Sequence, residues 1–156
     1  MTSMKVLILA ATIALSAIVM SARAQTYDVF ATAYPFDVPE GVVRDGIGNI
    51  YVANSSGPGS VASTVVRITP AGAVSTVFTE PSSYGFTQLF GVALDSHGGL
   101  FVADATHSLI FEISPSGSVS TFAGPDQGLV GPTGLVFDGA DNLYVSNANI
   151  NTVTKI

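Results

Sequence analysis

The segment GLFVADATHSLIFEI, residues 99–113, decides the fold. In its first half, Leu100 and Val102 face one side of an extended strand, while Phe101 and Ala103 face the other side. A strand with one solvent-exposed face alternates apolar and polar residues, so apolar residues on both faces indicate that both are covered. The segment therefore predicts a strand inside a sheet that is packed between two neighbours.

Close relatives of this segment occur twice more in the 156-residue chain, which identifies an internal repeat. The shared frame is a glycine, two apolar residues, an aspartate, a short turn, and a strand with an aromatic residue and a valine. It covers PEGVVRDGIGNIYVANS (39–55), LFGVALDSHGGLFVADA (89–105) and PTGLVFDGADNLYVSNA (132–148). A second pair of matching strands follows in TVVRITPAGAVSTVF (64–78) and LIFEISPSGSVSTFA (109–123), and TVTKI (152–156) matches their start.

Each repeat predicts four antiparallel strands joined by Asp/Gly-rich and Pro/Gly-rich turns. No segment after residue 25 has a helical period. Four-stranded units that recur every 40–50 residues are typical of β-propeller blades. We expect an all-β propeller segment with blade 1 at 39–80, blade 2 at 90–124 and a partial blade 3 at 132–156. Residues 26–33, TYDVFATA, precede the repeats and predict a displaced outer strand.

Three blades are too few to close a ring, because propellers have at least four. The segment corresponds to an incomplete ring, half of a six-bladed propeller, and its end blades would expose apolar faces. Three interpretations follow. The chain is a segment of a longer propeller, or it is an unstable remnant, or two chains form a homodimer that closes a six-bladed ring.

The repeat resembles the NHL repeat. The pattern P-x-G, two apolar residues, x-D-x-x-G-N, an apolar residue and Y-V-A-(D/N) is followed by I-x-x-(I/V)-x-P-x-G-x-V-S-T-F-A-G. It is nearly complete in 90–124, mostly present in 39–80, and continues through 132–156. The resemblance implies a propeller fold for 25–156. Such propellers serve binding, scaffolding, lactone hydrolysis and lyase chemistry, and exported examples include gluconolactonase-like and virginiamycin B lyase-like proteins.

The first 24 residues are typical of a cleavable signal peptide. An apolar run at 6–19 follows Lys5, and Ala22-Arg23-Ala24 matches a signal-peptidase site. The run is shorter than the roughly 20 residues of a membrane span, although an uncleaved anchor is the alternative. We therefore expect a secreted or periplasmic protein that is cut after Ala24, with no membrane contact after cleavage.

Composition excludes several classes of function. After residue 24 the chain has three basic and eleven acidic residues, a net charge of −8, so a nucleic-acid interface is not expected. There is no cysteine, which excludes disulfides, thiolate catalysis and Cys-type zinc sites. No phosphate-binding loop, serine nucleophile elbow or HExxH motif occurs.

The positions before the frame glycines are the first candidate ligands. They are Glu40, Phe90 and Thr133. In gluconolactonase-like relatives, equivalent positions supply Asn and Asp ligands to a divalent metal. Here Glu40 alone is a plausible metal ligand, whereas such a site needs several convergent donors, so we expect no metal and no cofactor.

The residues that end each repeat's second strand, Asn54, Asp104 and Asn147, share a face with those positions. They could bind a ligand at the channel mouth, or they could cap the following turn through Asx-type hydrogen bonds, which is the commoner role. The frame aspartates are expected to form turns: Asp45, Asp95 and Asp138.

The chain has two histidines, His97 and His107. His97 lies in a turn on the opposite face, and His107 lies three residues after Asp104 on the predicted ligand face. A virginiamycin-lyase-like mechanism would need a histidine base with a nearby carboxylate and a metal, whereas a solvated loop histidine is the ordinary interpretation.

The sequence thus predicts a binding or interaction module without evident catalytic residues, for a protein or small-molecule ligand. The candidate ligand-binding residues are Glu40, Asn54, Asp104, His107, Thr133 and Asn147. The alternative is a lactonase- or lyase-like enzyme whose missing residues come from further blades or from a second chain.

Overall fold

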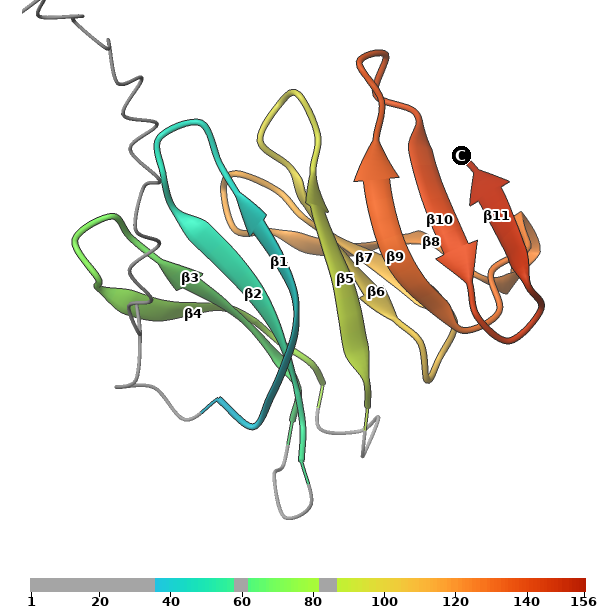
Figure 1. Ribbon diagram of the computed structural model, residues 1–156, viewed down its shortest axis with the longest axis horizontal. Helices are drawn as coiled ribbons and strands as arrows, with labels where there is room; N and C mark the ends of the chain where they lie inside the picture. Colours follow the sequence, from blue (N-terminus) through green and yellow to red (C-terminus); the bar gives the residue numbers. More distant parts are fainter. Residues whose placement is uncertain (1–35, 58–61, 82–86) are drawn as a thin grey trace, which may run out of the picture.

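The computed structural model describes residues 36–57, 62–81 and 87–156, whose strands form three antiparallel sheets (Figure 1). The first sheet has the order β1 (Val38–Arg44), β2 (Ile50–Ser55), β3 (Thr64–Ile68), β4 (Val74–Thr79). The second has the order β5 (Leu89–Leu94), β6 (Leu100–Asp104), β7 (Leu109–Ile113), β8 (Val119–Ala123). The third contains β9 (Pro132–Phe137), β10 (Leu143–Asn147) and β11 (Thr152–Lys155), with β10 in the middle. The predicted all-β class is confirmed. The expected signal peptide at 1–24 and outer strand at 26–33 lie outside the described residues.

The first strands of the three repeats, β1, β5 and β9, lie side by side and form the inner edge of the arrangement (Figure 1). The frame glycines make this approach possible. A Cβ on Gly41 would collide with the carbonyl oxygen of Phe90, and one on Gly91 with that of Thr133. The strand register shifts beside each of these two glycines, which marks a β-bulge.

The core consists of two clusters, one on each side of the second sheet. Leu100 and Val102 pack in the cluster toward the first sheet, and Phe101 packs in the cluster toward the third. All five residues of β6 are buried, whereas β2 and β10 are only partly buried. The predicted two-sided burial of β6 is therefore confirmed, and it arises because the second sheet lies between the other two.

The outer faces of the end sheets expose apolar side chains. Val42 of β1 is 66% exposed, and Val136 and Val153 of the third sheet are 59% and 69% exposed. These side chains occupy positions that a neighbouring sheet would cover.

The turns between the first and second strands share one hydrogen-bond pattern. Oδ1 of Asp45 accepts from the backbone amides of Ile47 and Asn49, at 3.1 and 2.8 Å. Asp95 and Asp138 accept from the amides two and four residues later in the same way. The three aspartates are turn formers, as predicted.

A short 3-10 helix at Pro125–Gln127 was not anticipated by the sequence analysis. It lies between β8 and β9, and the side chain of Gln127 accepts from the amide of Gly124 at 2.8 Å. Among the described residues, no helix has the length and apolarity needed to cross a membrane.

Substituting Gly91→Ala should lower the free energy of unfolding by about 1–3 kcal/mol, because the new methyl group must displace the β9 backbone. Gly139→Ala is the matched control, because a Cβ there meets nothing within 4 Å. Urea denaturation of both variants measures the difference. Equal stabilities would contradict the role given to the close approach.

The carboxylate of Asp138 should stabilise the fold in a pH-dependent way. Hydrogen bonds, first from the Asn142 side chain and then from backbone amides, lower its pKa from 3.8 to about 2. Its contribution is therefore complete above pH 3.8 and lost as the pH falls through about 2. Asp138→Ala should lower the thermal midpoint at pH 7, and this deficit should shrink between those pH values. Gly139→Ala, in the same turn, should show no such pH dependence.

Candidate functional site

The positions before the frame glycines come together, but they supply few donors. Glu40, Phe90 and Thr133 line a shallow groove of about 340 Å³ that crosses β1, β5 and β9. The hydroxyl of Thr133 lies 3.1 Å from that of Ser146 in its own sheet. The three positions thus bring one carboxylate, one aromatic ring and one engaged hydroxyl to the inner strands.

Asn54 and Asn147 are buried at equivalent places and make equivalent contacts. Oδ1 of Asn54 accepts from the amide of Asp37, and Oδ1 of Asn147 accepts from the amide of Val130, each at 3.0 Å. Both donors lie 17 residues earlier, in the segment that leads into the sheet's first strand. The expected Asx-type bonds to the following turn were wrong, because the carbonyl oxygens hold the preceding connection. The side-chain amides donate to hydroxyls of the following strand, Thr64 and Thr152, each at 3.4 Å.

Asp104 occupies the same position in the second repeat and does cap the following turn. Oδ1 accepts from the amide of His107 at 3.0 Å, and Oδ2 lies 2.7 Å from Nδ1 of the same histidine. Asp104 is fully buried, and the His107 side chain is 30% exposed. The sequence favoured a solvated loop histidine at this position, whereas the structure pairs His107 with Asp104.

Glu80 joins this pair and was missed by the sequence analysis. It directly follows β4, and ligand atoms of Glu80, Asp104 and His107 all lie within 4.8 Å of one another. Glu80 is 3% exposed, and the Thr87 hydroxyl donates a hydrogen bond to its Oε2. Burial, together with the neighbouring Asp104 carboxylate, raises the pKa of Glu80 to about 8.

The sequence carried a weak signal for Glu80. Phe78 pairs with Val65 in the first sheet as Ala123 pairs with Ile110 in the second, so Glu80 corresponds to Pro125. An acidic residue where the next repeat has proline is a departure from the repeat. The sequence does not show that the end of β4 lies beside Asp104, because that contact joins different sheets.

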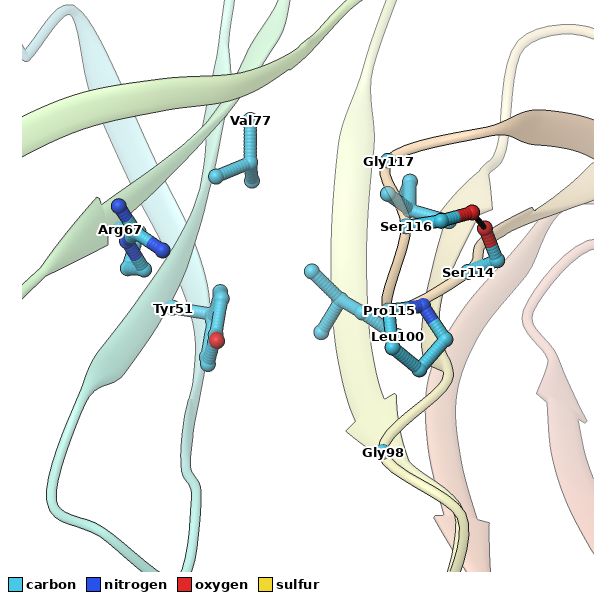
Figure 2. A pocket seen from close by; sticks show the side chains of 10 residues that line it. Tyr51, Arg67, Val77, Gly98, Leu100, Ser114, Pro115, Ser116 and Gly117 are labelled. Atoms are coloured by element: carbon cyan, nitrogen blue, oxygen red, sulfur yellow. Dashed lines mark hydrogen bonds between the residues drawn. The ribbon is translucent and has the colours of Figure 1, made fainter.

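A pocket of about 250 Å³ lies between the first and second sheets (Figure 2). It is lined by Leu100 at the start of β6, whereas Asp104, which neighbours Glu80, ends that strand. Its lining comes from both sheets and from the turn that joins β7 to β8. Figure 2 shows Tyr51, Arg67 and Val77 on one side and Leu100, Ser114, Pro115, Ser116 and Gly117 on the other.

Arg67 is the charged residue of this pocket. Its Nε is buried and has no hydrogen-bond partner among the described residues. Burial and the Asp45 carboxylate raise the pKa of the neighbouring Tyr51, while the charge of Arg67 opposes that shift. A buried guanidinium N–H beside a pocket of mixed polar and apolar lining is a donor in need of an anionic or carbonyl acceptor.

His97 lies in the turn between β5 and β6, at the opposite end of β6 from His107, as predicted. Its side chain is 81% exposed, and its Nδ1 lies 3.6 Å from Asp141 of the third sheet. The hydroxyl of Ser96 donates to the same carboxylate at 2.5 Å. These contacts join the turns of the second and third sheets.

Comparison with known proteins finds relatives by structure. No protein-family model matches the chain, and no curated protein matches it by sequence. A structure of virginiamycin B lyase from Staphylococcus aureus matches 76% of this chain and 38% of its own, with a TM-score of 0.61 and 15% identity. A nidogen/laminin complex matches 85% and 47%, with a TM-score of 0.67 and 20% identity. A putative gluconolactonase matches 70% and 41%, with a TM-score of 0.53 and 16% identity.

The chain spans less than half the length of each of these structures. At such identities the similarity shows the fold, and that fold is shared by enzymes and by a protein of a binding complex. The chain is a β-propeller segment of three blades.

Proposed function

We propose that this chain is a propeller-type binding module that receives a small organic anion in the pocket between its first two sheets. The observation that carries the proposal is the buried Nε of Arg67, which has no acceptor among the described residues. An unsatisfied buried donor is costly, and a bound carboxylate would satisfy it through a charge-assisted hydrogen bond.

The residues that line the pocket indicate what the ligand contains besides its negative charge. Val77, Leu100 and Ile113 supply apolar surface, and Ser114 and Ser116 supply hydroxyls. A compact carboxylate with an apolar body matches this combination, because the carboxylate would pair with Arg67 while the body is removed from water.

The overall charge of the chain opposes anion binding, so a local cation is required for it. Acidic residues outnumber basic ones by eleven to five, so the molecule repels anions overall. A cation placed in a pocket of such a molecule is the feature that would allow an anion to bind selectively.

The inner groove favours binding over catalysis. A lactonase- or lyase-like enzyme would need several convergent donors there, and the positions before the frame glycines bring only the carboxylate of Glu40 and the engaged hydroxyl of Thr133. The similarity to the nidogen/laminin structure also supports a binding role, since that structure is a complex between proteins.

We also propose the repeat type, the export and the assembly of the chain. The sequence pattern supports NHL-type repeats and an exported chain that is cut after Ala24. The exposed Val42, Val136 and Val153 support association with further blades, either of a longer chain or of a second copy that closes a six-bladed ring.

Benzoate is a suitable probe, with benzamide as its neutral analogue. Isothermal titration calorimetry should detect benzoate binding, while benzamide should bind at least about tenfold more weakly, because it lacks the charge that pairs with Arg67. Arg67→Gln should remove the preference for the anion.

Lys155→Gln is the matched control. Lys155 occupies the position of Arg67 in the third repeat, but it is exposed and lies over the Tyr144 ring, 5.6 Å from its centroid. This variant should bind benzoate as the parent chain does. If Arg67→Gln and Lys155→Gln had equal effects, or if benzamide bound as well as benzoate, the assignment would be wrong.

A further inference from the structure

The cluster of Glu80, Asp104 and His107 is separate from the Arg67 pocket and has no part in the proposed anion binding. It lies at the other end of the interface between the first two sheets. Glu80 comes from the end of the first sheet, and Asp104 and His107 come from the second. Three residues with strong metal-ligand chemistry thus converge from different blades.

The environment of Glu80 leaves one of its carboxyl oxygens available to a cation. Its Oε2 accepts from the Thr87 hydroxyl, and its backbone amide donates to the carbonyl of Ser63. Its Oε1, by contrast, is buried without a hydrogen-bond partner among the described residues. The side chain is therefore held in place beside the Asp104 carboxyl group, with Oε1 able to accept a proton or a metal ion.

The two carboxyl groups of this cluster also favour a bound cation. Asp104 is fully buried and Glu80 is 3% exposed, so two carboxyl groups share a space that water does not reach freely. Two buried carboxyl groups so close together cannot both stay ionised unaided, so the pair holds either a proton or a cation. The imidazole of His107 contacts Asp104, and no Lys or Arg among the described residues makes an ion pair with either carboxyl group.

We propose that Glu80, Asp104 and His107 form a binding site for a divalent transition-metal cation. Zn²⁺ is the representative ion, because a mixed set of one imidazole nitrogen and two carboxylate oxygens suits it, whereas Ca²⁺ prefers oxygen ligands alone. Ligands of a tetrahedral Zn²⁺ lie roughly 3.3 Å apart, given bond lengths of about 2.0–2.2 Å. The present separations, within 4.8 Å, would have to shorten by up to about 1.5 Å on binding.

A metal ion could reach this cluster from solvent, and its binding would connect two blades. The His107 side chain is 30% exposed, so the cluster reaches the surface on its histidine side. A bound ion would connect the end of β4 to the turn after β6, and so would fasten the first blade to the second.

The test begins with the metal-free full chain, which is titrated with Zn²⁺ and followed by calorimetry and by thermal unfolding. One ion should bind per chain, and it should raise the unfolding temperature. Glu80→Gln and His107→Ala should each weaken binding by at least about tenfold, since even substitutions behind a ligand typically cost 10- to 100-fold. Glu80→Gln retains the shape of the side chain and should leave the metal-free fold intact.

His97→Ala is the control for adventitious binding, because His97 is exposed beside Asp141 on another face. It should bind Zn²⁺ as the parent chain does. The chain has two histidines, so NMR can follow both imidazoles, and Zn²⁺ should shift the C–H resonances of His107 alone. The proposal is overturned by a chain that binds no Zn²⁺, by binding lost only in His97→Ala, or by binding unchanged in both cluster variants.

Discussion

The structure depends on apolar packing between neighbouring sheets, because none of the three described sheets buries its apolar residues alone. The second sheet is the clearest case, because side chains of β6 pack in both hydrophobic clusters, one on each side of the sheet. Without cysteines, the chain has no disulfide to supplement this packing. Backbone contact at Gly41 and Gly91 brings the inner strands close enough for the two cores to form.

The same packing buries polar side chains at the strand ends, and their chemistry decides whether they need a further partner. At the ends of β2 and β10, Asn54 and Asn147 are neutral and satisfy backbone amides, so their burial needs no further partner. At the equivalent end of β6, the repeat places Asp104, which carries a carboxyl group in place of an amide and is fully buried. One substitution within the repeat thus turns a structural hydrogen-bond position into one that attracts His107 and accommodates Glu80.

Much of the fold could be predicted because it is encoded locally and repeated. The two-sided apolar pattern of β6, the turn-forming aspartates and the frame glycines each recur at a fixed place in the repeat. The candidate sites were less predictable, because they combine residues of different sheets. Asp104 and His107 are three residues apart and could be paired from the sequence, whereas Glu80 and the Arg67 pocket depend on how β4 and β3 lie against the second sheet.

Both candidate sites lie at the first interface rather than the second, and the difference between the interfaces explains this placement. At the second interface, Phe101 packs edge-on against Phe122 and Phe137, with ring centroids 4.9 and 4.8 Å apart, and the Ser96–Asp141 hydrogen bonds join the turns. At the first interface, β6 presents the smaller Leu100 to Tyr51 and Val77, which leaves the pocket that Arg67 borders. Strict repetition would have filled both interfaces alike, so it is the divergence between repeats that creates space and unpaired polar atoms for a ligand and for an ion.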